Sequence, residues 1–220
     1  MLRGSCPLLA SLLVVGLGCS EAAEATISEP VLCDDCETAA TFDATFDAAF
    51  DATLLVVDRG GESLLAFDGN GQLIDVVASA SDCGLNRPAS VHQGPNGALY
   101  VANFGDSTVI RLEGDTAETF YSDSAWLEEP IDVLFRDRAL YVLGNDTKNV
   151  VVLDEHGVLV KELRNEAMRD LHDFALGPDG RLYVAAGSHP TLHCAVQVWD
   201  AGDGALVDCF GTPDEIGFAT

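Results

Sequence analysis

Four short apolar segments recur along the chain at a nearly constant spacing. They begin at Leu54, Leu99, Leu140 and Leu182, so that successive starts lie 45, 41 and 42 residues apart. Each segment is apolar at consecutive rather than alternating positions, as in LLVV and LYVA, which is typical of strands covered on both faces of a sheet. Long runs with the 3.6-residue period of a helix are missing. The pattern predicts an all-β fold.

Two further markers run in phase with these segments. Tight-turn sequences, GPNG at 94–97 and GPDG at 177–180, come just before two of the segments. Markers in phase at about 40 to 45 residues indicate a β-propeller in which each repeat is a four-stranded blade. A helical or leucine-rich solenoid is excluded because the helical pattern is missing. The second marker, an apolar residue followed by an acidic one, occurs at Phe67-Asp68, Leu112-Glu113, Leu153-Asp154 and Trp199-Asp200.

The repeats resemble those of the NHL type. The resemblance rests on Pro-x-Asp-Val at 130–133, on GPDGRLYVA at 177–185 and on strands that end in Trp-Asp or Leu-Asp, and it covers residues 44–220. It implies a propeller that usually has six blades, whereas four are complete here and Pro213–Thr220 looks like the first strand of a fifth. The sequence is compatible with two arrangements of the blades: a four-bladed ring completed by that strand, or a shortened six-bladed propeller with an open edge.

A tandem triplet of Phe-Asp-Ala stands ahead of the repeats, with Phe42, Phe46 and Phe50 spaced four residues apart. On a helix this spacing would give a short amphipathic docking segment. The alternative, which we favour, aligns Thr45-Phe46 with Ser90-Val91 as the innermost strand of the first blade.

Residues 1–18 have the pattern of a signal peptide. Arg3 precedes an apolar run of 11 residues, 7–17, which is too short to span a bilayer as a helix. Residues 15–19, VGLGC, resemble a bacterial lipobox, in which Cys19 would receive the lipid. The chain is therefore expected to be an exported lipoprotein of the cell envelope. The alternative is cleavage after Ala25, which would release a soluble secreted protein.

The charge balance limits the partners. The chain has 36 acidic and 11 basic side chains, a formal net charge of −25 at pH 7. Such a charge repels phosphate backbones and anionic lipid headgroups, so we expect no nucleic acid and no membrane contact except through a lipid anchor.

The cysteines are interpreted for an oxidising compartment, where disulfides are the default. Cys194 and Cys209 flank a turn between two apolar segments, so a cross-strand disulfide is expected. Cys33 and Cys36 lie in an acidic linker, residues 19–43, with CxxC spacing. Neighbouring aspartates disfavour a redox thiolate, and a second ligand pair for zinc is missing. One of these two is expected to bond Cys83.

Polar side chains are expected to converge where the inner strands of the blades begin. Three carboxylates and several other oxygen donors around one axis would suit a hard cation such as Ca²⁺, while the alternative is a set of solvated loop acids. The equivalent inner-strand positions are Ser90, Asp132, Asp173 and Glu215, and the neighbouring loops contribute Asp58, Asn103 and Asn145, with His172 as the candidate general base.

Two functions follow. The first is an exported propeller that binds a ligand or protein partner through its loop face without catalysis, with no certain cofactor. The second is a metal-dependent lyase or lactonase-like hydrolase, which the NHL resemblance also allows. A nucleophile elbow, a P-loop, a GxGxxG motif and an HExxH motif are all missing from the sequence, which favours binding.

Overall fold

The computed structural model describes residues 15–17, 54–114, 116–166, 168–187 and 195–211. Its strands form four sheets of four, called blades here, and in each sheet neighbours in space are also neighbours in sequence. Blade 1 comprises β1 (Val15–Leu17), β2 (Leu54–Asp58), β3 (Ser63–Phe67) and β4 (Leu73–Ser79). Blade 2 comprises β5 (Pro88–Gln93), β6 (Leu99–Asn103), β7 (Thr108–Glu113) and β8 (Thr116–Tyr121). Blade 3 comprises β9 (Pro130–Arg136), β10 (Ala139–Gly144), β11 (Asn149–Leu153) and β12 (Leu159–Leu163). Blade 4 comprises β13 (Leu171–Leu176), β14 (Leu182–Ala186), β15 (Val196–Trp199) and β16 (Leu206–Phe210).

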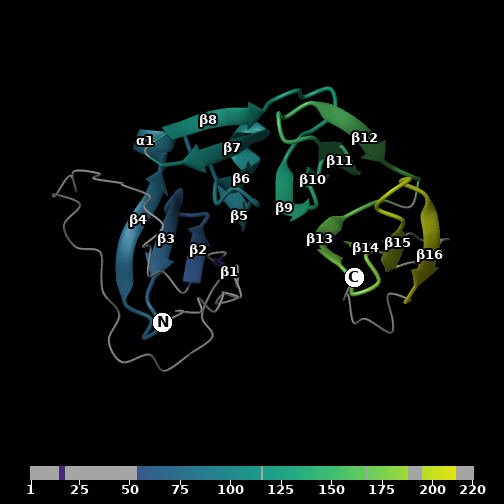
Figure 1. The fold of residues 1–220 in the computed structure, drawn as a ribbon, viewed down its shortest axis with the longest axis horizontal. Helices are drawn as coiled ribbons and strands as arrows, with labels where there is room; N and C mark the ends of the chain where they lie inside the picture. Colours follow the sequence, from purple (N-terminus) through teal and green to yellow (C-terminus); the bar gives the residue numbers. More distant parts are fainter. Residues whose placement is uncertain (1–14, 18–53, 115, 167, 188–194, 212–220) are drawn as a thin grey trace, which may run out of the picture.

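The blades fan around a common centre (Figure 1). In blades 2 to 4 the first strands, β5, β9 and β13, lie towards the centre, and the last strands lie outside. The expectation of an all-β protein with four four-stranded blades is confirmed. The described strands trace an open arc with blade 1 at one end and blade 4 at the other (Figure 1). The strand expected at Pro213–Thr220 lies outside the described residues, so the mode of closure stays a prediction.

The second strand of each blade explains why the repeats are apolar at consecutive positions. In β10, Leu140 and Val142 pack against blade 2, whereas Tyr141 and Leu143 pack against blade 4. All four side chains are buried. Because alternate residues of a strand point to opposite faces, both faces of the middle strands are covered by neighbouring blades. Each apolar cluster lies between two blades, so the blades depend on one another for burial.

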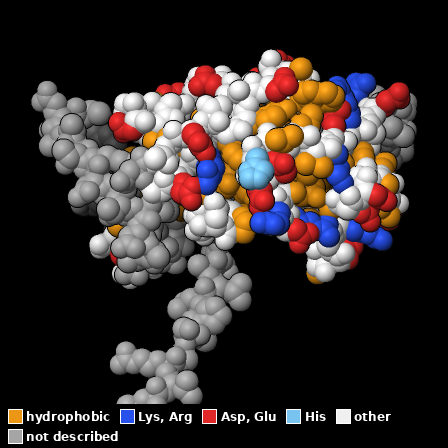
Figure 2. Space-filling view, turned by 45° about the horizontal axis from the view of Figure 1, so that its top comes forward, with side chains coloured by type: hydrophobic (Ala, Val, Ile, Leu, Met, Phe, Trp, Pro, Cys, Tyr) orange, Lys and Arg blue, Asp and Glu red, His pale blue; other side chains and the backbone are white. Residues whose placement is uncertain are grey.

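The outer strands face water. In β4 the side chains of Leu73 and Ile74 are exposed, and all five residues of β16 are exposed. On the face in Figure 2, acidic and basic side chains lie among hydrophobic ones rather than in one patch of a single charge.

The turn sequences that mark the repeats have local structural causes. Gly97 closes the turn before β6 with φ of +87°, in the left-handed region that glycine tolerates. Asp154 follows β11 and accepts hydrogen bonds from the N–H groups of His156 and Val158, both at 2.9 Å. These bonds stabilise the carboxylate and lower the pKa of Asp154 below its usual range. Asp68 and Asp200 make equivalent turns after β3 and β15.

The innermost position of blade 1 is taken by β1, which pairs in parallel with β2. This strand comes from the predicted signal peptide, so the predicted cleavage before Cys19 would remove it and leave β2, β3 and β4 of blade 1. The strand expected there, at Thr45-Phe46, and the whole Phe-Asp-Ala triplet lie outside the described residues.

Cys83 is free, so the expected disulfide between it and Cys33 or Cys36 is wrong. The residue ends the short helix α1 (Ala80–Cys83) and packs, half-buried, against the apolar cluster between blades 1 and 2. Cys194 lies outside the described residues, and its pairing with Cys209 stays a prediction. None of the helices within the described ranges has the length and hydrophobicity that crossing a membrane requires.

Candidate functional site

The inner strands of blades 2, 3 and 4 begin with the same irregular backbone. Arg87, Glu129 and Asp170 immediately precede these strands, and their φ angles are +48°, +49° and +46°. Two residues further on, at Ala89, Ile131 and His172, each strand has a β-bulge at which its register with the next strand shifts by one residue. A bulge redirects the side chain that follows it. Those next residues are the predicted Ser90, Asp132 and Asp173.

The loops beside these strand starts belong to the same end of the blades. Gly105 donates its N–H to the carbonyl of Asn86 at 2.8 Å, and Asn145 donates to that of Glu129 at 3.0 Å. In blade 4, the N–H of Gly187 bonds the carbonyl of Asp170 at 2.9 Å. We call this end the loop face. It comprises the connections into β5, β9 and β13 and the loops that follow β2, β6 and β10.

Ser90, Asp132 and Asp173 meet as predicted. The N–H of Val133 donates to Ser90 Oγ at 3.0 Å and to Asp132 Oδ1 at 2.8 Å. The Ser90 hydroxyl and the Asp173 carboxyl are close enough to the Asp132 carboxyl to shift its pKa. Ser90 is buried, Asp132 is half-buried and Asp173 is exposed, so the cluster opens outward on the side of Asp173. We refer to Asp132 and Asp173 as the acid pair.

Asp132 holds a proton at neutral pH. The pKa of Asp132 is raised to about 8, first by burial and then by the neighbouring Asp173 carboxyl and its negative charge. The Ser90 hydroxyl and the Val133 N–H act in the opposite direction by stabilising the carboxylate. A protonated carboxyl beside a second carboxyl forms a site that can exchange the proton for another positive group.

Two of the predicted loop residues, Asp58 and Asn103, form hydrogen bonds with backbone groups of the loop face. Asp58 accepts hydrogen bonds from the N–H groups of Gly60 and Gly61 at 3.0 and 2.8 Å. Asn103 is buried; its Oδ1 accepts from the N–H of Asn86 at 2.6 Å, and its amide donates to the carbonyl of Gly84 at 3.1 Å. These contacts give both residues a structural role in the loops.

Asn145 is not equivalent to Asp58 and Asn103. The strand register places Gly144 opposite Asn149, as Asn103 lies opposite Thr108, so Asn145 stands one position further into its loop. Its amide donates to the Glu129 carboxylate at 3.0 Å.

His172 is the bulge residue of β13, and it is exposed beside Asp173. Glu215 lies outside the described residues. Within the described ranges, no three or more His, Cys, Asp or Glu side chains are arranged to hold a metal ion. The described part of the predicted calcium site is therefore the acid pair with Ser90.

Two hollows lie elsewhere. One of about 600 Å³ on the loop face is lined by Lys148, Arg164 and Arg169, and by the carboxylates of Glu166 and Asp170, which balance part of their charge. Sequence reasoning missed this hollow, because most of its lining comes from an irregular connection between blades 3 and 4.

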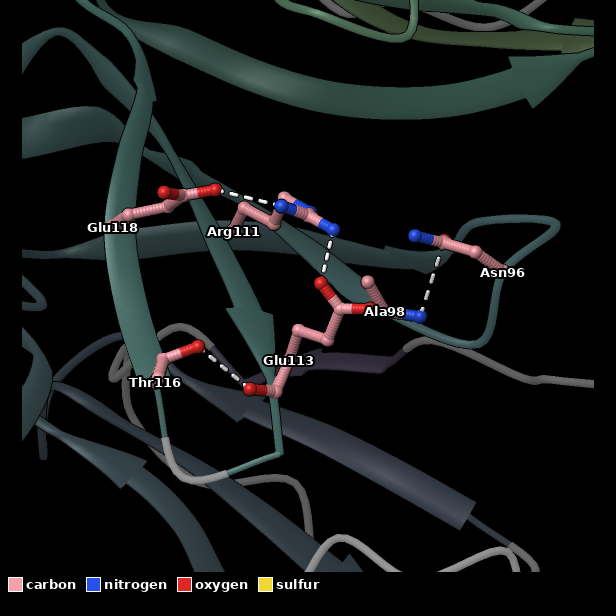
Figure 3. Close-up of polar contacts among 6 residues, drawn as sticks. All are labelled: Asn96, Ala98, Arg111, Glu113, Thr116 and Glu118. Carbon is pink, nitrogen blue, oxygen red and sulfur yellow. Dashed lines mark hydrogen bonds and ion pairs between the residues drawn. The ribbon is translucent and has the colours of Figure 1, made fainter.

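The second hollow, of about 300 Å³, lies between blades 2 and 3 at the opposite end of the strands, where Tyr100 and Phe135 form aromatic walls. Arg111 and Arg138 both line it, and the Arg111 guanidinium donates to Glu118 at 2.7 Å and also to Glu113 (Figure 3). Arg111 is neutralised within its own hairpin.

Comparisons with known proteins support the fold. No protein-family model matches the chain, and no curated protein matches it in sequence. Among solved structures, it resembles catalytically inactive virginiamycin B lyase from Staphylococcus aureus with quinupristin, with a TM-score of 0.56 and 15% identity. It also resembles a gluconolactonase from Xanthomonas campestris, with a TM-score of 0.54 and 19% identity. The WD40 β-propeller domain of Doa1 is similar as well, with a TM-score of 0.51 and 15% identity.

These likenesses cover 72%, 74% and 74% of this chain, but only 52%, 62% and 54% of the respective structures. The chain therefore spans little more than half the length of the propellers that it resembles. At such low identity the likeness concerns the fold alone. Together with the four radial sheets, it identifies the chain as a β-propeller.

Proposed function

We propose that this chain is an exported propeller of the NHL type, held at the cell envelope by a lipid on Cys19, that binds a ligand through its loop face without catalysis. The ligand presents a cationic group or a hydrogen-bond donor to the acid pair. Ser90 fixes one side of the site through its hydrogen bond with Val133 and its position beside Asp132.

The observation that carries this proposal is the half-buried Asp132 carboxyl with a raised pKa, which lies beside Asp173 and Ser90. A half-buried carboxyl with a raised pKa, beside a second carboxyl, is a strong acceptor for a positive group that displaces the proton. The net charge of −25 draws cations towards the surface and speeds their encounter with such a site.

The second candidate is a metal-dependent lyase or lactonase-like hydrolase. The likeness to a lyase and a gluconolactonase favours it. Oxygen donors such as Asp132, Asp173 and Ser90 suit Ca²⁺, which would polarise a substrate carbonyl when bound, with Glu215 as a further ligand and His172 as the base. We place it second because the described residues supply only two carboxylates at this point.

Calorimetric titration of the full chain with a primary diamine and, separately, with calcium chloride tests both candidates. Saturable binding of either probe that is lost in Asp132→Asn and Asp173→Asn, and kept in Asp75→Asn, supports the site. Asp75 is an exposed residue of the outer strand β4, so this control removes the same charge far from the loop face.

Hydrolysis of glucono-δ-lactone, followed in a pH-stat, separates the two candidates. Binding without hydrolysis supports the first. Calcium-dependent hydrolysis that Asp132→Asn abolishes establishes the second. If neither probe binds wild-type protein, both candidates fail.

Mass spectrometry tests the proposed localisation and the proposed disulfide directly. A diacylglyceryl mass on Cys19 of the mature protein supports the anchor, whereas a mature chain that begins at Thr26 supports secretion and overturns the anchor. The proposed Cys194–Cys209 bridge is supported by the disulfide-bonded state of Cys209, and peptide mapping without reductant would identify its partner.

A further inference from the structure

Two arginines share one aromatic ring on the loop face. The guanidinium carbon of Arg59 lies 4.0 Å from the centre of the Phe104 ring, and that of Arg87 lies 4.8 Å from it. Arg59 follows β2, Arg87 precedes β5, and Phe104 begins the 3₁₀ turn η1 (Phe104–Asp106) after β6. Segments from blades 1 and 2 thus bring two cations to one ring.

Among the carboxylates of the described residues, none lies within 4.0 Å of either cation, although acids are close along the chain. Asp58 accepts from two N–H groups of its own loop at 3.0 and 2.8 Å. Asp106 accepts from the Asn86 amide at 2.8 Å, and Glu129 accepts from the Asn145 amide at 3.0 Å. The nearby carboxylates are thus engaged by amide groups.

The lack of a counter-ion is unusual for this molecule. Five of the eight described arginines form ion pairs, which are those at positions 111, 136, 138, 164 and 181. The chain has 36 acidic residues, yet these two adjacent arginines form no ion pair with a described carboxylate. Burial and then the positive charge of Arg87 lower the pKa of Arg59, while Glu129 offsets part of this effect. The two guanidiniums therefore repel each other at a place where an anion would relieve the repulsion.

We propose that Arg59 and Arg87, held on the Phe104 ring, form a binding site for a small oxyanion, the carboxylate or phosphate group of a ligand. Planar guanidinium groups match both chemistries through paired N–H donors. Stacking on the ring fixes their planes before the ligand arrives, which reduces the entropy cost of binding. The site depends on these three residues and not on the acid pair, so it stands whether or not the proposed function does.

The test is calorimetric titration of the full chain at low ionic strength with inorganic phosphate and, separately, with acetate. We expect saturable binding of at least one anion at one site per chain, weakened about tenfold or more by Arg87→Gln, since a charged hydrogen bond contributes about 1.5–3 kcal/mol. Arg87 is exposed, so this variant should fold, and an unchanged melting curve checks it. Arg87→Lys keeps the positive charge but loses the paired N–H donors of the guanidinium, so this variant should bind the anion with intermediate affinity.

Arg138→Gln is the matched control, because it removes one exposed arginine that is already paired with Glu155. Binding of phosphate alone or acetate alone assigns the anion class. The proposal is overturned if wild-type protein binds neither anion saturably, or if Arg87→Gln and Arg138→Gln weaken binding equally. Asp132→Asn should leave anion binding intact, which keeps this result separate from that of the acid pair.

Discussion

The Ser90 hydroxyl accepts a hydrogen bond from the N–H of Val133, 43 residues away, at 3.0 Å. This bond crosses from the innermost strand of blade 2 to that of blade 3. It also places Ser90 beside Asp132, whose carboxyl lies close to both Ser90 and Asp173. Three blades thus contribute one polar side chain each to a single cluster, and their relative position fixes its geometry.

Asp132→Asn should increase stability at alkaline pH. The pKa of Asp132 is raised to about 8 in the folded protein, whereas an unfolded aspartate has a pKa of about 4. Between these values the folded state binds more protons, so the stability contributed by this group is present at low pH and falls as the pH rises from about 4 to about 8. Asparagine keeps a donor for Asp173 without ionising. At pH 8.5 its melting temperature should exceed that of wild type by roughly 2–4 °C, about 1 kcal/mol or more.

Melting curves at pH 5 and pH 8.5 check this prediction. The difference between Asp132→Asn and wild type should grow with pH, whereas Asp75→Asn should show no comparable trend. A difference that stays constant between the two pH values would contradict a raised pKa.

Asn103→Ala should destabilise the protein although the residue lies at a loop. Its buried side chain bonds Asn86 and Gly84, and it also donates to Thr108 Oγ1 at 3.2 Å. Alanine leaves these groups without partners, at a cost of about 2 kcal/mol or more. Urea unfolding measures the loss. The exposed Asn70→Ala is the control, and equal effects of the two substitutions would refute the structural role.

Leu140→Ala and Leu143→Ala should be similarly destabilising. Both side chains are fully buried, but Leu140 packs towards blade 2 and Leu143 towards blade 4. Each truncation should cost about 2–5 kcal/mol in urea unfolding, whereas exposed Leu73→Ala should cost less than about 0.5 kcal/mol. A sheet with one solvent-facing side would lose stability at only one of the two leucines.

Gly97→Ala should cost about 1 kcal/mol through backbone strain alone. Its φ is +87°, and a Cβ there would meet nothing within 4 Å. Gly60→Ala, at a loop glycine without a positive φ, should be nearly neutral. Thermal unfolding of the two variants compares them, and equal stabilities would show that conformation at Gly97 does not constrain the turn.

The fold could be predicted because buried positions form a recognisable hydrophobic pattern in the sequence. Consecutive apolar residues such as those from Leu140 to Leu143 signal two covered faces, and the turn glycines and aspartates repeat in phase. The same alignment found Ser90, Asp132 and Asp173, because equivalent positions of repeated blades meet at the centre.

The remaining features depend on geometry that residue types do not encode. Asn145 stands one position further into its loop than Asn103, a difference set by strand register that residue type does not reveal. The bulges at Ala89, Ile131 and His172 carry no common residue. The two arginines on Phe104 come from segments whose contact exists only after blades 1 and 2 have packed.

The central claim is that Asp132, beside Asp173, keeps its proton at neutral pH, and carbon-detected NMR titration of the Asp132 carboxyl tests it most directly. We expect the Asp132 carboxyl to titrate well above the usual range of aspartate, and its midpoint to fall towards that range in Asp173→Asn, where the neighbouring charge is gone. If the Asp132 carboxyl titrates near pH 4 in wild-type protein, it is ionised at neutral pH, and the proposed ligand site loses its physical basis.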